Sequence, residues 1–122
     1  MSKFTFTKED IYIGYIRTLE SFTTALIKED DIKVGARVFE DFDIYIRTYL
    51  CEKNLRIYLD EGWIDCDIAE KSISLFESFC AMEKEHPELR NVEAVKNAEE
   101  WRKLMELSED IRADLYYIPD ME

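Results

Sequence analysis

The sequence predicts an all-α fold in which a single domain, residues 1–122, forms a bundle of four or five helices. The chain holds only three glycines and two prolines, so few positions favour tight turns or break a helix. Apolar residues recur at steps of three and four over four long segments, which is the spacing of one helical face. A hydrophobic content of 47% is enough to form a buried core in a chain of 122 residues.

The first two helices follow from this spacing and from one capping signal. Thr7 is expected to cap the amide near Asp10, and the first helix then runs to about Lys28. Its inward residues are Tyr12, Tyr15, Ile16, Leu19, Phe22 and Leu26. After an acidic break at residues 29–31, the spacing resumes and predicts a second helix that ends near Cys51. Its inward residues are Val38, Phe39, Phe42, Tyr45, Ile46, Tyr49 and Leu50.

Residues 54–62, with the sequence NLRIYLDEG, fit two patterns. Leu55, Ile57 and Leu59 alternate as in a strand, whereas Leu55, Tyr58 and Leu59 fit one turn of a helix. We favour the helix, because the sequence offers no strand that could pair with this segment.

Two further helices complete the predicted fold. Asp67 is expected to cap a third helix that ends near Glu85, because Pro87 disfavours helical geometry in the residue before it. Its inward residues are Ile68, Leu75, Phe76, Phe79 and Cys80. A fourth helix is expected to start at Asn91 and to stop before Pro119. Its inward residues are Val92, Val95, Ala98, Leu104 or Met105, Ile111 and Leu115.

The charge of the chain is strongly negative. There are 28 acidic and 16 basic residues, which gives a formal net charge of −12. Such a field repels nucleic acid and anionic membrane surfaces and attracts cationic proteins, although the charge could also serve solubility alone. We therefore expect a basic protein partner and no direct contact with nucleic acid or membrane. The beginning of the chain, MSKFTFTKED, has no apolar signal region, which favours a cytoplasmic protein; the oligomeric state stays open.

Metal and cofactor sites find little support in the sequence. Residues 60–67, DEGWIDCD, are rich in carboxylates, but Gly62 and Ile64 stand where a calcium-binding EF-hand loop needs oxygen ligands. A weak divalent-cation site at Asp65 and Asp67 remains an alternative. We predict no metal and no cofactor.

Catalytic chemistry finds no signature either. Glu83 and His86 have the spacing of one half of a di-iron site, but the chain has a single histidine and such sites need two. The three cysteines are odd in number and lack the spacing of a redox or zinc pair. We read them as reduced thiols, with Cys51 and Cys80 buried and Cys66 exposed. The sequence therefore predicts a protein that is not an enzyme.

The stretch at residues 60–67 instead has the composition of a protein-binding surface. Trp63 is surrounded by one sign of charge, and large aromatic residues contribute most of the binding energy in many interfaces. The alternative is that Trp63 packs down onto the core, since tryptophan is highly buried on average. The candidate partner-binding residues in this stretch are Asp60, Glu61, Trp63, Asp65 and Asp67.

The end of the fourth predicted helix offers a second candidate surface. Tyr116 and Tyr117 are adjacent, so a helix that ends there cannot bury both on one face. Asp114 and Asp120 flank them. We expect one tyrosine to join the core and the other to contact a partner or to close the edge of the bundle.

Two short stretches resemble bacterial immunity proteins. The string DLYYIP, residues 114–119, is similar to the Asp-Leu-Ile-Tyr-Tyr-Pro stretch of colicin DNase immunity proteins, and EEWRK, residues 99–103, resembles their Gln-Trp-Arg segment. The two stretches stand here in the opposite order. The resemblance implies a small helical inhibitor that neutralises a basic nuclease toxin of the colicin or contact-dependent growth inhibition kind.

Two other functions remain open. A DNA mimic or acidic regulatory module, which binds a DNA-binding protein, would use the same negative charge. A scaffold or enzyme subunit would carry the charge only for solubility.

Overall fold

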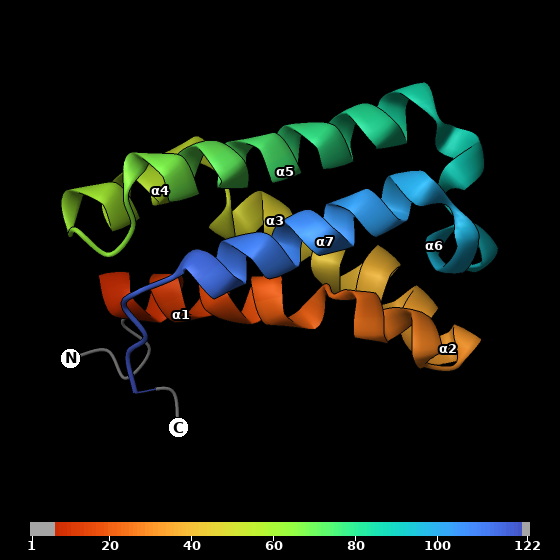
Figure 1. Ribbon diagram of the computed structural model, residues 1–122, viewed down its shortest axis with the longest axis horizontal. Helices are drawn as coiled ribbons and strands as arrows, with labels where there is room; N and C mark the ends of the chain where they lie inside the picture. Colours follow the sequence, from red (N-terminus) through yellow and green to blue (C-terminus); the bar gives the residue numbers. More distant parts are fainter. Residues whose placement is uncertain (1–6, 121–122) are drawn as a thin grey trace, which may run out of the picture.

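The computed structural model describes residues 7–120, and every regular element in that range is helical (Figure 1). The longer helices are α1 (Lys8–Ser21), α4 (Glu52–Asp60), α5 (Cys66–Glu85) and α7 (Glu99–Asp114). The shorter elements are η1 (Thr24–Lys28), α2 (Asp31–Gly35), η2 (Ala36–Phe42), α3 (Asp43–Tyr49), η3 (Pro87–Leu89) and α6 (Val92–Asn97). The predicted all-α class is confirmed.

The described helices number six rather than four or five. The elements α2, η2 and α3 form one continuous helix, because the residues at both junctions keep right-handed helical backbone angles. The additional helix arises at Ala98, whose ψ of 137° separates α6 from α7 inside the single helix predicted from Asn91. This break lets α6 pack against both α2 and α7, where Val95 is fully buried.

The first helix starts as predicted and ends early. The Thr7 hydroxyl accepts from the Asp10 amide at 3.0 Å, and the Asp10 carboxylate accepts from the Thr7 amide at 2.9 Å. Beyond Ser21 the chain leaves the α-helix and continues as the 3₁₀ turn η1. Here Glu109 of α7 accepts from both the amide and the hydroxyl of Thr24, each at 2.9 Å. The contact with Glu109 thus satisfies groups of Thr24 in a segment that the apolar spacing had predicted to be α-helical.

The second helix begins at Asp31, within the acidic stretch that was expected to precede it, and contains a wider turn. Asp30 caps it by accepting from the amide of Lys33 at 2.8 Å. Residues 36–42 form a π-helix, in which Asp43 donates its amide to the carbonyl of Val38, five residues back. Because the wider turn rotates the faces of the helix, Tyr45 is 42% exposed rather than inward.

The segment at 54–62 is helical up to Asp60, as we favoured, and forms α4. The next helix, α5, is capped by Asp65 and not by Asp67: the Asp65 carboxylate accepts from the amide of Ile68 at 2.9 Å. α5 ends at Glu85, as predicted, and Asn91 caps α6 through the amide of Ala94 at 2.8 Å.

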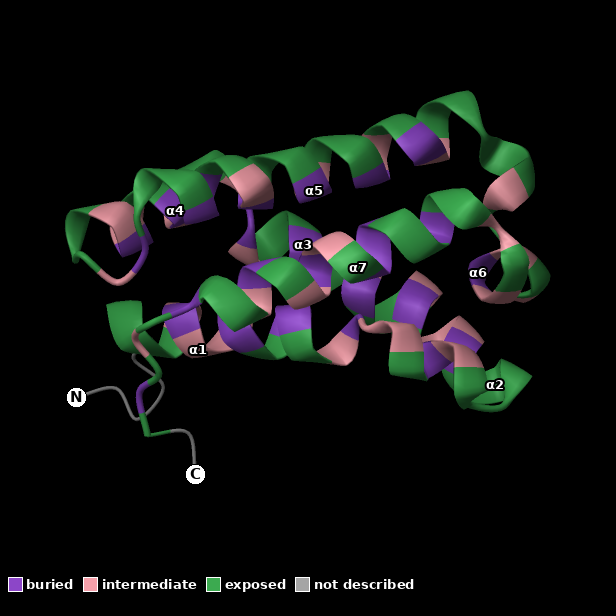
Figure 2. Ribbon diagram, viewed as in Figure 1, coloured by how far each residue is buried: buried purple, intermediate pink, exposed green. Residues whose placement is uncertain are grey.

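Buried residues lie where α1, α5 and α7 face one another (Figure 2). α7 packs against α1 and α5, and α1 also packs against α3. All six inward residues predicted for the first helix are buried. Three phenols gather in this core, Tyr12, Tyr15 and Tyr58, with the Tyr15 and Tyr58 rings 4.8 Å apart. Within residues 7–120, no helix combines the length and the apolar composition that crossing a bilayer requires.

Burial of these phenols makes the fold sensitive to alkali. Burial raises the pKa of Tyr12 from 10.0 to about 12, and it also raises the pKa of Tyr15 and of Tyr58. A raised folded-state pKa contributes stability that is complete below the unfolded pKa and is lost as pH rises through the folded pKa. We expect the free energy of unfolding to fall between pH 10.0 and about 12.

Urea unfolding midpoints at neutral pH and across that interval check this expectation. Tyr12→Phe lacks one of the titrating phenols and should lose less stability over the interval than the parent does. A midpoint that stays constant throughout the interval would contradict the assignment.

Candidate functional site: an acidic surface at one end of the molecule

The two stretches singled out in the sequence lie side by side in the fold. The hydroxyl of Tyr116 donates to the carbonyl of Gly62 at 3.2 Å, and Lys71 of α5 pairs with Asp114 at 2.6 Å. The α4–α5 loop and the segment after α7 meet at the end of the molecule where α1 begins (Figure 1). We call the exposed part of this region, residues 60–67 and 114–118, the end surface. Sequence reasoning proposed both stretches but not their contact.

Local signals explain why the chain turns here. α4 stops at Asp60, and Gly62 takes a φ of 77°, which favours glycine because it has no Cβ. Two residues later the buried Ile64 anchors the loop, and Asp65 starts α5. After α7, the extended backbone of Leu115 carries the chain away from the helix, and Pro119 is buried.

Trp63 packs on the inner side of this surface, against Tyr12 and Tyr117. Its ring lies 5.5 Å from the ring of Tyr117 at an interplanar angle of 15°, and 5.1 Å from the ring of Tyr12. The half-buried indole packs against the hydrophobic core. This geometry favours the second of our two interpretations of Trp63, in which the ring packs inward.

The two adjacent tyrosines have different surroundings, as the sequence led us to expect. Tyr117 is half-buried, and its hydroxyl donates to Glu9 of α1 at 2.9 Å. Tyr116 is 59% exposed, and the neighbouring Ile118 is 44% exposed. Tyr116 is therefore the aromatic side chain that the end surface presents to solvent.

The carboxylates of the end surface divide into two groups. Glu61 forms an ion pair with Lys8 at 3.2 Å, Asp65 caps α5, and Asp114 pairs with Lys71. The hydrogen bond that Lys71 donates to Asp114 raises the pKa of Lys71, so this ammonium stays charged. Asp60 and Asp67 are exposed, and neither side chain has a hydrogen bond or ion pair with the described residues.

A shallow hollow of about 430 Å³ lies at the border between the end surface and the first turns of α5. Its lining residues are Asp65, Asp67, Ile68, Glu70, Lys71 and Asp114. A single ammonium, that of Lys71, faces several carboxylates there. The hollow therefore suits a cationic side chain better than an anionic one.

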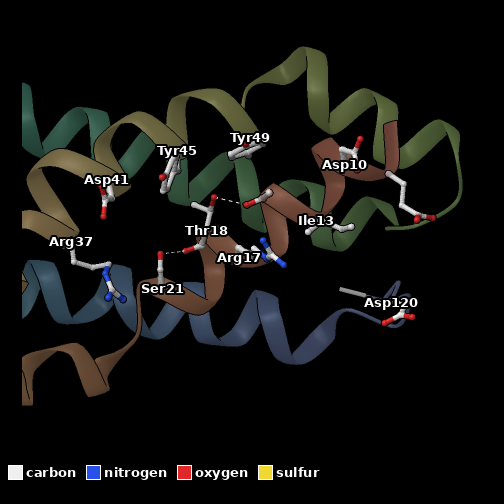
Figure 3. Close-up of a pocket in the computed structure, with 12 residues that line it drawn as sticks. Asp10, Ile13, Arg17, Thr18, Ser21, Arg37, Asp41, Tyr45, Tyr49 and Asp120 are labelled. Carbon is white, nitrogen blue, oxygen red and sulfur yellow. Dashed lines mark hydrogen bonds between the residues drawn. The ribbon is translucent and has the colours of Figure 1, made fainter. Parts of the chain in front are cut away.

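One candidate residue lies elsewhere. Asp120 lines a groove beside α1, together with Glu9 and Asp10, rather than the hollow that contains Asp65 and Asp67 (Figure 3). The structure thus brings together eight of the nine residues proposed from the sequence and places the ninth on an adjoining face.

The other chemical candidates have structural surroundings. Over residues 7–120, no group of three or more His, Cys, Asp or Glu side chains is arranged to hold a metal ion. Glu83 forms ion pairs with Arg47 and Arg90, and His86 contacts Glu88 at 3.1 Å. All three cysteines are free thiols; Cys66 is exposed, whereas Cys51 and Cys80 are half-buried rather than buried.

No protein-family model, curated protein or solved structure matches this chain. The resemblance to immunity proteins therefore remains a prediction from two short stretches. In the fold these stretches lie at opposite ends of α7, roughly 20 Å apart at 1.5 Å per residue. Trp101 of the first stretch is buried and donates to the carbonyl of Leu89 at 2.7 Å, so the two stretches do not share one exposed surface.

Replacing Trp63 by alanine tests its supporting role. The change removes the ring that packs against Tyr12 and Tyr117. We expect it to lower the free energy of unfolding by about 3 kcal/mol, which is at the lower end of the range for replacing a buried aromatic residue by alanine. Tyr116→Ala is the matched control, because Tyr116 is mostly exposed and its loss should cost below about 1 kcal/mol. Urea unfolding measures both. Equal midpoints for Trp63→Ala and the parent would contradict this role.

Proposed function

We propose that this chain is a non-enzymatic inhibitor of the immunity-protein type, which neutralises a basic toxin by binding it through the end surface. The observation that carries this proposal is the meeting of two acidic stretches, distant in sequence, around the exposed Tyr116. We also propose that the protein is cytoplasmic and that its helices form one bundle in a single domain. The resemblance to immunity proteins supplies the nature of the partner.

Negative charge would act first, at long range. The formal net charge of −12 favours the approach of a cationic partner and raises the association rate. Asp60 and Asp67 are well placed for this, because both are exposed and neither forms a hydrogen bond or an ion pair with a described residue. Charges that are paired within the fold, such as Glu61 with Lys8, contribute less to the attraction of a cationic partner.

Aromatic contact would act second and would slow release. The Tyr116 ring is held by its hydrogen bond to Gly62, so little side-chain entropy is lost when a partner covers it. Ile118 extends the apolar area beside it. Tyrosine is one of the residues enriched among interface hot spots.

This arrangement favours an inhibitor over a DNA mimic. A mimic needs carboxylates spread along an extended face at phosphate-like spacing. Here two basic side chains, Lys8 and Lys71, interrupt the negative surface through ion pairs with Glu61 and Asp114. Among the carboxylates of the end surface, only Asp60 and Asp67 lack a hydrogen bond or an ion pair with a described residue.

Growth rescue tests the proposal directly. The genes next to this one are expressed singly in a bacterial host, and any that stops growth is co-expressed with this chain. We expect one toxic neighbour to be neutralised, and we expect Tyr116→Ala to weaken the complex by about 2 kcal/mol, roughly 30-fold, mainly through faster dissociation. If Tyr116→Ala still rescues growth and dissociates from the toxin at the rate of the parent, the interface lies elsewhere.

Charge reversal at Asp60 and Asp67 tests the steering step. We expect the double lysine variant to associate with the toxin about tenfold more slowly at low salt, with a smaller dependence on salt. The control variant reverses Glu77 and Glu85, two exposed residues further along α5, and changes the net charge equally. Stopped-flow or surface-binding kinetics measure both rates. Equal slowing in both variants would show that only total charge matters.

A further inference from the structure

The segment that follows α7, residues 116–120, is irregular and runs past the first turns of α1 (Figure 1). We call it the strap. Within it, no backbone group forms a backbone–backbone hydrogen bond with another described residue. The last such bond before it runs from the amide of Leu115 to the carbonyl of Arg112, at 3.3 Å. The exposed side chains of the strap are Tyr116, Ile118 and Asp120, and those turned inward are Tyr117 and Pro119.

Three hydrogen bonds tie the strap to the fold, and a tyrosine hydroxyl donates each of them. Tyr12 donates to the carbonyl of Tyr117 at 2.9 Å, and Tyr117 donates to the carboxylate of Glu9 at 2.9 Å. Tyr116 donates to the carbonyl of Gly62 at 3.2 Å. Among the described residues, no further hydrogen bond or ion pair joins the strap to a helix or a loop. The strap is therefore held by side chains and not by a backbone ladder.

The groups that receive the strap are anchored without it. The ring of Tyr12 also contacts the rings of Tyr15 and Tyr58, at 5.7 and 5.2 Å. In the α4–α5 loop, Ile64 is buried and Asp65 caps α5. A segment with few buried contacts and no backbone ladder opens at a smaller free-energy cost than a packed helix does. The strap can thus leave its place without unfolding the helices.

We propose that the strap opens and recloses as a unit about Leu115 while the helices stay folded, and that its closing assembles the end surface. The structure shows the closed state, in which Tyr116 is bonded to Gly62. The open state is the minor one and accounts for roughly 0.1–10% of the molecules. Lid motions of this kind take microseconds to seconds. The inference goes beyond the proposed function, because it concerns a motion of the fold and requires no toxin.

Opening replaces one exposed aromatic group by another at this end of the molecule. In the closed state, the ring of Tyr117 stacks on the indole of Trp63 with the centroids 5.5 Å apart. In the open state, that face of the indole meets water and Tyr116 leaves Gly62. The strap is thus an autoinhibitory cover for Trp63, the aromatic residue of the stretch DEGWIDCD. A partner that covers Tyr116 selects the closed state, whereas a partner that binds Trp63 selects the open one.

Fluorine NMR on the full chain labelled with fluorinated tryptophan tests the inference, because the chain has two tryptophans in different surroundings. Trp63 lies against the strap, whereas Trp101 is buried and packs against Phe39 and Phe79. We expect relaxation dispersion to detect exchange at Trp63 and to give a flat profile at Trp101. Trp101 serves as the internal reference, because unfolding of the whole protein affects both signals.

Two substitutions loosen the strap without removing a ring. Tyr116→Phe and Tyr117→Phe together remove two of the three hydrogen bonds. We expect the double variant to raise the ratio of open to closed molecules about 25-fold, which is about fivefold for each bond. Tyr45→Phe is the matched control, because Tyr45 is exposed and its hydroxyl has no hydrogen bond with a described residue. It should change the ratio by less than about twofold.

Two results would overturn the inference. One is a flat profile at Trp63 in the parent and in the phenylalanine variants of the strap. The other is exchange at the same rate at Trp63 and Trp101, which means that the whole protein unfolds. If the Trp101 signal shows that the double variant is unfolded, each single variant provides the same test. Neither result bears on the rescue of growth by the end surface, since no toxin takes part in the measurement.

Discussion

The contacts of Tyr12 organise the end of the molecule that carries the candidate surfaces. Its ring lies within 5.7 Å of those of Tyr15, Tyr58, Trp63 and Tyr117, which come from α1, α4, the α4–α5 loop and the segment after α7. Its hydroxyl donates to the carbonyl of Tyr117 at 2.9 Å. A buried phenol with a satisfied hydroxyl thus fixes an otherwise irregular segment, because a backbone carbonyl in this position needs a donor. Tyr12 therefore contacts both acidic stretches, through the rings of Trp63 and Tyr117.

Local signals in the sequence were sufficient for much of the fold. The capping box at Thr7 and the inward positions of the first helix depend on neighbours within a few residues, and the structure confirms both. The π-helix at residues 36–42 was not predictable in this way, since spacing of three and four residues assumes an α-helical turn throughout. The same limit explains Tyr45, which the spacing placed inward and the wider turn leaves partly exposed.

The candidate surfaces show where sequence reasoning ends. Composition identified the carboxylates of residues 60–67, but the cap was predicted at Asp67, and the path of the loop places it at Asp65. The inward packing of Trp63 depends on Tyr12 and Tyr117, which are 51 and 54 residues away in the chain. The groove was missed because its lining comes from α1, from η2 and α3 and from Asp120, which the sequence does not place side by side. In each case the deciding contact joins residues that are distant in the sequence, and spacing within one helix does not reveal it.

The end surface and the groove are joined by the segment that follows α7. The hydroxyl of Tyr117 donates to Glu9, a residue of the groove, while the hydroxyl of Tyr116 reaches Gly62 on the end surface. Adjacent side chains therefore hold the two faces in fixed relative positions. Because these hydrogen bonds form on folding, a partner that meets either face does not have to order the segment, and the entropy cost of binding is correspondingly smaller.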